Sequence, residues 1–513
     1  MSSLPLKSEQ KTNRFYKPHK ITLGRGICYG ISDFIGGGSM TIIGAWMLFF
    51  YTTYCGLTAV QGGLIIGVSR IVDAFTTLCM GSLTDHFYKT RLGKRFGRRH
   101  FFMLFGSPLL LSYAVLWISG LNFWYYLVSY MAFEIISSAI LIPYETLPNE
   151  MTEDYKERTK LSSSRMFVSA GATFLSTFIP GQLFKLLGQD SPLPFFVNGA
   201  IFAVIFFVCM LVTTMTTWEK PYDEVVAMEA KVQQEKTSII ELLKEYISTL
   251  KNKSFRKHLA IYLFSFTGKD TFNTVFAYFV TFCLGLTATD AANMLSFSII
   301  GLVVVPIAGV LMVKKGPKFL FVSGYLVMLA MLGAYLCVYL FKPSSPMVWL
   351  VVISLVYQIG RATLEFTPWN VFPFIPDIDE LVNGRNRAGE FAAVMTFCRK
   401  STVAVATIAT GWILDEFGFN GNAKVQTPEA QTAIVSVLVG LTGVLLILAI
   451  ICALTFKVNQ STHDVLIKEI NRLKDGGSKA DVDPKTKRVV EELAGVPYET
   501  MWPVSDTAES RNA

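Results

Sequence analysis

Three polar residues, Arg70, Asp73 and Thr77, lie inside an otherwise apolar stretch that runs from about residue 58 to residue 83. Their spacing of three and then four places them on one face of a helix. A guanidinium and a carboxylate at membrane depth are costly unless they pair or face a wet cavity. These residue types suggest binding of an ion or a polar solute within a membrane. An ion pair that only joins two helices is the alternative.

Charged residues recur at similar depth in other apolar stretches, which favours a shared polar cavity. Each intramembrane ion costs about 2.5–3.5 kcal/mol on insertion scales, so a purely structural role for all of them is disfavoured. Any single pair, such as Arg361 with Glu365, could still be an intrahelical salt bridge without a ligand. The candidate substrate-binding residues are Arg70, Glu134, Glu145, Arg165, Lys269, Arg361 and Lys400, and further ions lie at Asp33, Asp270, Glu365 and Arg399.

The composition is that of a polytopic membrane protein. The chain has 513 residues, of which 52% are hydrophobic and only 16% charged, against roughly 25% charged in soluble proteins. The formal net charge of +8 comes from basic residues in short loops, as the positive-inside rule expects, so the expected partner is a lipid bilayer and not nucleic acid. The eight cysteines are scattered without a metal-ligand spacing, and we expect no metal and no cofactor.

Twelve apolar stretches are each long enough to cross about 30 Å of hydrocarbon. The connections on one side carry most of the loop lysines and arginines, which predicts that both termini are cytoplasmic. The polar N-terminus lacks an apolar signal core, so the first span is expected to direct insertion. The predicted starts are near Leu23, Thr58, Arg99, Phe123, Thr159, Pro194, His258, Ala291, Lys318, Met347, Gly389 and Thr432.

A polar segment divides the spans into two halves of six, which predicts an all-α fold with two six-helix bundles around a site at the membrane midplane. The predicted regions are a cytoplasmic N-terminal segment (1–22), an N-terminal bundle (23–218), a cytoplasmic linker (219–257), a C-terminal bundle (258–456) and a cytoplasmic tail (457–513). Ser238 and Glu241 predict a capping box for an amphipathic helix in the linker. The polar tail shows a short helical pattern followed by a Pro-, Ser- and Asp-containing end, and it is expected to be partly disordered.

The loop that carries Gly81, Asp85, Arg91 and Gly93 resembles the loop motif of the major facilitator superfamily, which implies a gating role. Other motifs make the chain similar to one family of that superfamily, the glycoside–pentoside–hexuronide:cation symporters, which include the melibiose carrier. The resemblance covers residues 23–456 and rests on Tyr29-Gly30, Ser69-Arg70, Asp73-Ala74, Ile142-Pro143-Tyr144, Arg165 and Lys400.

The resemblance implies that Asp73 is a cation-site carboxylate, that Lys400 is its partner charge and that Arg165 lies near the sugar. The chain departs from the family where Thr77 replaces a second carboxylate of the cation site. It also departs at Gly37, Leu141 and Glu145, which align with two sugar-binding carboxylates and a stacking tryptophan. A carboxylate beside a hydroxyl could bind Na⁺ or take a proton. A proton needs only one group, so we favour H⁺.

The second half carries four bases at membrane depth, Lys269, Arg361, Arg399 and Lys400, which are expected to face only two acids. This surplus favours an anionic ligand, since arginine binds carboxylates through two parallel hydrogen bonds. We therefore expect a multi-pass, monomeric transporter of the bacterial inner membrane that imports a sugar or glycoside by cation symport with alternating access. The substrate class favoured is a uronide, and the branch resembled most is that of the oligogalacturonide importers.

Three alternatives remain: a neutral oligosaccharide symporter, a lipid carrier on the same fold and a membrane receptor that does not transport. A closed polar cavity would oppose the lipid carrier, whereas a laterally open apolar cleft would support it. A receptor would not need paired ions at midplane. An enzyme is not expected, because the sequence shows no nucleophile–base constellation and no phosphate loop.

Overall fold

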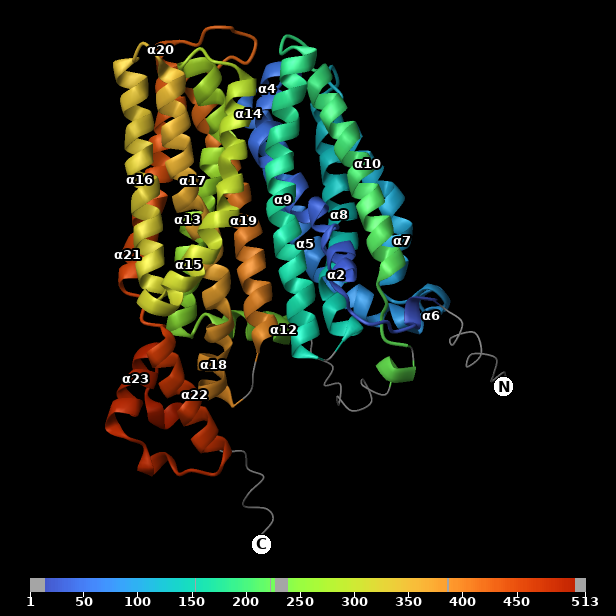
Figure 1. Ribbon diagram of the computed structural model, residues 1–513, viewed down its shortest axis with the longest axis vertical. Coiled ribbons are helices and arrows are strands. Elements are labelled where there is room, and N and C mark those ends of the chain that lie inside the picture. The colour runs from blue at the N-terminus through green and yellow to red at the C-terminus, as the bar shows by residue number, and fades with distance from the viewer. Residues whose placement is uncertain (1–13, 153, 222, 227–238, 385–386, 503–513) are drawn as a thin grey trace.

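The computed structural model describes residues 14–152, 154–221, 223–226, 239–384 and 387–502, and within these residues all regular structure is helical. Long helices stand side by side in two groups, and the C-terminal tail extends from one end (Figure 1). The N-terminal group is coloured blue to green and the C-terminal group yellow-green to orange. The predicted all-α fold of two helix bundles is confirmed.

The first half begins with a span built of short pieces in series. It alternates α-helical and π-helical turns, and the π-helix η2 contains Gly36, Gly37 and Gly38. The elements of this half are η1 (Arg14–Tyr16), α2 (Leu23–Gly30), η2 (Phe34–Ser39), α3 (Met40–Ile42), η3 (Ile43–Met47), α4 (Leu48–Tyr54), α5 (Ala59–His86), η4 (Phe87–Lys89), α6 (Arg91–Phe96), α7 (His100–Gly106), η5 (Ser107–Trp117), α8 (Phe123–Met151), α9 (Tyr155–Leu187) and α10 (Leu193–Thr216).

The second half follows the linker helix α12 (Ile239–Thr249). Its elements are α13 (Lys253–Tyr278), η6 (Phe279–Cys283), α14 (Ala288–Ser296), η7 (Phe297–Ile300), α15 (Gly301–Lys315), α16 (Pro317–Phe341), α17 (Pro346–Val371), η8 (Phe372–Phe374), α18 (Ile375–Asn383), α19 (Ala388–Glu416), α20 (Pro428–Val435), η9 (Ser436–Leu441) and α21 (Thr442–Leu454).

Among the described residues, 11 of these helices are long and apolar enough to cross a membrane. The twelfth crossing is α13 with η6, which carries Lys269 and Asp270 side by side in its middle. These two charged side chains lower the hydropathy of α13 relative to that of the other spans. The helix nevertheless packs among those spans, and most of its residues are buried. The observed helices begin within five residues of the predicted starts.

The bundle has two chemically different ends. The basic helix α6, the linker helix α12 and the tail lie at the same end in Figure 1, and α4, α14 and α20 approach the opposite end. The positive-inside rule predicts that the first end faces the cytoplasm and the second end the outside of the cell, and we refer to them as the cytoplasmic and the extracellular end.

The described part of the tail is largely helical. It forms the helices α22 (Gln460–Lys474) and α23 (Pro484–Ala494), followed by η11 (Tyr498–Thr500). The helical pattern of the tail therefore extends further than the sequence predicted, and Leu466, Ile470 and Leu493 of these helices are buried as part of the hydrophobic core. Ion pairs such as Lys474–Glu380 fasten the tail to α18. Residues 503–513 lie outside the described part of the chain.

The linker helix α12 lies against the cytoplasmic start of α19. Arg387, at the N-terminus of α19, donates a hydrogen bond to the Ser248 hydroxyl at 2.7 Å and forms a two-pronged ion pair with Asp379. The predicted capping residue Ser238 lies outside the described residues. The hydrogen bond between Arg387 and Ser248 attaches the linker helix to the second half at this end.

Candidate functional site

A cavity of about 640 Å³ lies between the two halves and is lined by helices of both. All nine residues predicted to bind the substrate or the coupling cation line it, and they come from α5, α8, α9, α13, α17 and α19. These residues are Arg70, Asp73, Thr77, Glu134, Glu145, Arg165, Lys269, Arg361 and Lys400. The spacing argument for Arg70, Asp73 and Thr77 therefore pointed to the face of α5 that meets the cavity.

The cavity wall is highly charged but electrically balanced. Six acids and six bases line it: Asp33, Asp73, Glu134, Glu145, Asp270 and Glu365 against Arg70, Arg165, Lys269, Arg361, Arg399 and Lys400. Every one of these bases has an acidic partner within 4 Å. A polar solute that enters must therefore compete with existing ion pairs.

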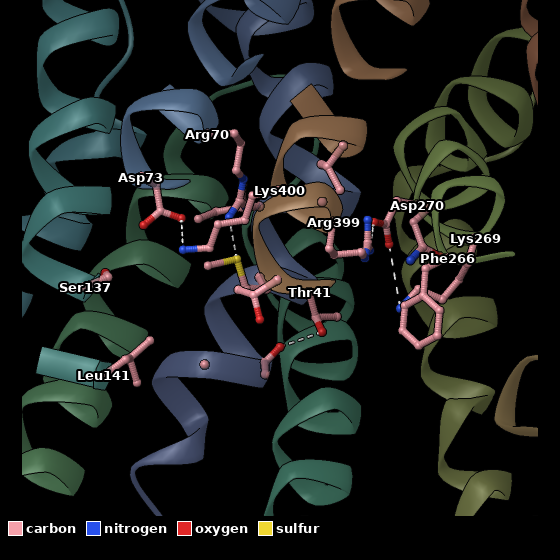
Figure 2. Close-up of a pocket in the computed structure, with 18 of the residues that line it drawn as sticks. Thr41, Arg70, Asp73, Ser137, Leu141, Phe266, Lys269, Asp270, Arg399 and Lys400 are labelled. Carbon is pink, nitrogen blue, oxygen red and sulfur yellow. Dashed lines mark hydrogen bonds and ion pairs between the residues drawn. The ribbon is translucent and has the colours of Figure 1, made fainter. Parts of the chain in front are cut away.

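Asp73 is the centre of a cluster that joins the halves. Its Oδ2 lies 2.7 Å from Lys400 Nζ, and Ser138 donates a hydrogen bond to its Oδ1. Lys400 Nζ also lies 2.5 Å from Thr77 Oγ1. Figure 2 shows the Lys400 side chain extending from α19 toward Asp73. Asp73 is only 1% exposed, so a carboxylate, two hydroxyl oxygens and an ammonium meet in a nearly dry corner.

Arg70 lies one turn away and is held by two groups of the same half. Its Nη1 lies 3.4 Å from Glu134 Oε1 and 2.8 Å from the Met40 sulfur. The Glu134 side chain is fully buried. This pair resembles an ion pair that only joins two helices more than an open binding group, because a buried charge needs its partner.

Arg165 is held between two carboxylates from different helices. Its Nε donates to Asp33 Oδ1 and its Nη2 to Glu145 Oε1, both at 2.8 Å. Its guanidinium carbon lies 5.3 Å from the centre of the Tyr144 ring, within cation–π range. The Glu145 side chain is half exposed, so this cluster presents an acidic oxygen and a guanidinium to the cavity.

The second-half wall carries four linked ion pairs on α13, α17 and α19, and the link is Lys269, whose Nζ also lies 3.7 Å from Asp270 Oδ1. Lys269 Nζ and Arg361 Nε approach the same oxygen, Glu365 Oε1, at 3.1 and 3.2 Å. Arg399 forms an ion pair with Asp270, and Figure 2 shows these side chains close to Phe266. Lys269 and Arg399 both lie over the Phe266 ring, at 4.7 and 5.3 Å from its centre.

This arrangement corrects the expected surplus of bases in the second half. Lys400 does not face Asp270 and Glu365, because α19 packs along α5 and carries Lys400 to Asp73 of the first half. Three bases, Lys269, Arg361 and Arg399, remain against two acids on that wall. The local excess is therefore one positive charge, smaller than the sequence suggested.

The predicted gating residues lie away from the cavity, at the cytoplasmic end of the first half. Asp85 forms an ion pair with Arg99 at 3.1 Å. Gly93 packs so closely on the Phe87 carbonyl that a side chain there would clash. Gly81 lies in the last turns of α5, and Arg91 is exposed at the start of α6. The contacts described here for Asp85 and Gly93 stay within the first half, so they do not join the bundles in this conformation.

Several residues with clear chemistry in the cavity were not among the predicted binding residues, although Asp33, Asp270 and Glu365 were recognised as ions at membrane depth. Asp33 holds Arg165, and Asp270 and Glu365 hold the bases of the second half. Trp369 lines the cavity, is 47% exposed and meets the Tyr262 ring edge-on. A signal for it was present, because Trp369 follows Glu365 by four residues on the stripe that begins at Arg361.

A two-bundle helical fold with a charged cavity at mid-depth defines a membrane transporter of the major facilitator type, and comparison with known proteins agrees. The sequence profile of the MFS/sugar transport protein family matches residues 28–460, and the chain belongs to this family. It is a multi-pass membrane transporter and not an enzyme.

Curated relatives cover most of the chain. The Bacillus subtilis protein named uncharacterized symporter YnaJ is 25% identical over 88% of this chain and 95% of its own length. The isoprimeverose transporter of Lactiplantibacillus pentosus is 27% identical over 79% and 82%. The glucuronide carrier protein homolog of Escherichia coli K12 is 23% identical over 78% and 85%.

Solved structures support the fold. The crystal structure of the nucleoside transporter NupG matches with a TM-score of 0.58 and 14% identity, over 85% of this chain and all of that chain. A bacterial homolog to the human lysosomal transporter Spinster matches with a TM-score of 0.56 and 14% identity, over 88% of this chain and 97% of its own. At these identities the likeness concerns the fold alone.

Proposed function

We propose that this protein imports a glycoside by cation symport across a bacterial inner membrane, and that its substrate is a uronide. The observation that carries the uronide is the wall where Lys269 and Arg361 share one oxygen of Glu365. Arg361, which is buried, and Lys269, which is partly buried and also pairs with Asp270, retain unused donors there, since arginine alone offers five N–H groups. A carboxylate of the substrate would complete this set of hydrogen bonds.

The aromatic residues beside that wall suit a sugar ring. Trp369 exposes 47% of its surface, and Tyr262 stands edge-on to it with ring centres 5.6 Å apart. A flat indole can cover the apolar face of a pyranose while charged groups bind its rim. The carrier names among the relatives, which include a glucuronide carrier homolog and an isoprimeverose transporter, also support a glycosidic substrate.

Coupling is assigned to Asp73, with a proton as the coupling ion. Its carboxylate is bonded to Lys400 from the other half, so its charge state controls a link between the bundles. Protonation of Asp73 would remove that attraction and free Lys400 to move with α19. A sodium ion would instead have to displace the ammonium and bind Asp73, Thr77 and Ser138, which offer suitable oxygens.

Two alternatives are weaker on this geometry. A lipid carrier would place acyl chains against the wall, and this wall carries twelve ionisable groups. A neutral oligosaccharide would leave Lys269, Arg361 and Arg399 to Asp270 and Glu365 alone. That second alternative is the one that the binding experiment addresses.

The test is calorimetric binding of digalacturonate, its methyl ester and a neutral digalactoside to the purified protein, with and without Na⁺. We expect the free acid to bind at least tenfold more tightly than the ester. Uptake into proteoliposomes under a proton gradient should follow the same order. Equal binding of acid and ester would contradict the proposed uronide specificity and favour a neutral glycoside as the substrate. Binding or uptake that needs Na⁺ would contradict the proposal that a proton is the coupling ion.

A further inference from the structure

The two halves are joined at the extracellular end by side chains that cap helices of the opposite half. Asp415, in the last turn of α19, accepts hydrogen bonds from the backbone N–H groups of Ala59 and Val60, at 2.8 and 2.9 Å. These are the first two residues of α5. Gln189, just after α9, accepts a hydrogen bond through Oε1 from the Ala288 N–H, the first of α14, at 2.9 Å.

An account of the helix-end donors shows why these bonds form. The first four N–H groups of a helix have no partner within it. In α5 the N-cap Thr58 accepts from Gln61 N through its side chain and from Gly62 N through its carbonyl. Ala59 N and Val60 N then remain, and these two are the donors that Asp415 takes.

The account for α14 in the other half is similar, except that the partner half caps only the first free donor. Its N-cap Thr287 accepts from Asp290 N and Ala291 N, again through side chain and carbonyl. The first donor, Ala288 N, goes to Gln189. The Gln189 amide also donates to Thr289 Oγ1 at 2.9 Å. Both helices thus carry a capping box of their own and receive a further cap from the partner half.

The two contacts occupy equivalent places in the repeated halves. α5 and α14 begin the second crossing of each half, and α9 and α19 form the fifth. The sequence repeats as well: Gly56-Leu57-Thr58 precedes Ala59 at the start of α5, as Gly285-Leu286-Thr287 precedes Ala288 at the start of α14. Gly56 and Gly285 have positive φ angles of 68° and 66°, which favour glycine.

Close packing beside each contact keeps the capping groups within reach. Gly411 lies against the Ala59 carbonyl so tightly that a side chain there would clash. Gly181 of α9 faces Ala292 of α14, where an added carbon would come within 3.0 Å of the alanine side chain. Separation of the halves at this end must break both sets of hydrogen bonds together.

We infer that Asp415 and Gln189 form a paired extracellular latch that holds the transporter closed to the outside by capping α5 and α14 across the interface. When the halves separate at this end, the freed N–H groups form hydrogen bonds with water. The latch therefore shifts the equilibrium between the states closed and open to the outside and does not block the transport cycle. This role is independent of the substrate and of the coupling ion. It adds to the proposed function a pair of residues outside the cavity.

The test uses one reporter cysteine at Gly44, which lines the cavity and has room for a side chain. Labelling with a membrane-impermeant maleimide is measured in vesicles of both orientations, and the parent chain without the reporter gives the background of the eight native cysteines. Asp415→Ala and Gln189→Ala should each raise labelling from outside about fivefold, the size of one lost helix cap. The double variant should approach the product of the two.

Matched controls remove neighbouring carboxylates that lie outside the latch. Glu416→Gln and Asp190→Asn alter exposed residues adjacent to the latch and should leave labelling unchanged. Gln189→Glu should also keep the latch, because a carboxylate at a helix N-terminus accepts the same hydrogen bond.

Two-sided labelling separates gating from damage. A shift of the equilibrium raises labelling from outside and lowers it from the cytoplasmic side, whereas a misfolded variant is labelled faster from both. If Asp415→Ala and Gln189→Ala label like the parent from both sides, or if Glu416→Gln produces the same outward shift, the latch is refuted.

Discussion

Lys400 Nζ on α19 lies 2.7 Å from Asp73 Oδ2 on α5, so an ion pair joins the two bundles in the middle of the membrane. The pair is unequal in its surroundings, because the Asp73 side chain is 2% exposed and that of Lys400 is 21% exposed. Lys400 can therefore leave toward the cavity, but Asp73 cannot follow. A group that neutralises Asp73 would free the lysine, which is the basis of the coupling proposal.

The first prediction concerns Asp73→Asn. The amide cannot hold a coupling proton, and it also weakens the attraction for Lys400. We expect uphill accumulation of labelled digalacturonate in proteoliposomes to be lost while counterflow exchange persists. Asp464→Asn, an exposed carboxylate of the tail, is the matched control. Normal accumulation by Asp73→Asn would place the coupling site elsewhere.

The second prediction concerns Arg361. Replacing it by alanine should weaken digalacturonate binding at least tenfold, or about 1.4 kcal/mol, because the guanidinium is a direct carboxylate donor in the proposal. Arg361→Lys should also be impaired, since a point charge cannot form two parallel bonds. Binding of the methyl ester should change little, and calorimetry on both ligands measures the difference. A parallel loss for acid and ester would show that Arg361 acts on the fold.

A matched control for charge is available in an extracellular loop. Lys424 is exposed between α19 and α20, so Lys424→Ala removes one positive charge without touching the cavity. It should leave both affinities unchanged. If Lys424→Ala weakened the binding of digalacturonate as much as Arg361→Ala does, long-range electrostatic attraction would explain the effect. Direct binding of the substrate carboxylate by Arg361 would then be contradicted.

The third prediction concerns the buried pair Arg70–Glu134. Removing one partner leaves an uncompensated charge, which costs about 3–5 kcal/mol in proteins. Glu134→Gln alone should therefore lower the thermal midpoint of the purified protein more than the double variant Arg70→Gln with Glu134→Gln. Equal midpoints for the single and double variants would show that an unpaired Arg70 costs no stability and would contradict this prediction.

The fourth prediction concerns the tail. Burial acts to raise the pKa of Glu469, but hydrogen bonds from Arg472 and Tyr498 outweigh it and hold that pKa below its usual range. A lowered carboxyl pKa stabilises the fold at pH values above the ordinary glutamate range, and this contribution is lost as pH falls through the lowered value. Hydrogen exchange in α22 and α23 should therefore lose protection below about pH 4.

Glu469→Gln is the control for that titration. The variant should exchange faster at neutral pH, because it lacks the charged acceptor for Arg472, and it should show a smaller acid dependence. Tyr498→Phe removes one donor and should give an intermediate result. An acid dependence of the same size in Glu469→Gln would assign the titration to another group.

The sequence by itself determined the class of fold, the crossings and the residues that face the cavity. Hydropathy and helical spacing carry this information, because a charged residue in a lipid-surrounded helix must turn inward. Arg70, Asp73 and Thr77 share a face through a local spacing of three and four. Arg361 and Glu365 meet within one helix for the same reason. None of these inferences needed a distant part of the chain.

The tertiary structure decided which charges meet. Helical spacing is silent about partners on other helices: the count of charges placed Lys400 with the second half, the family resemblance implied that it pairs with Asp73, and the packing of α19 on α5 brings these two side chains together. The order of the tail depended on its docking to α18, which its polar composition does not record. The contact of Asp415 with α5 joins residues 356 positions apart. Such long-range contacts arise only when the helices pack.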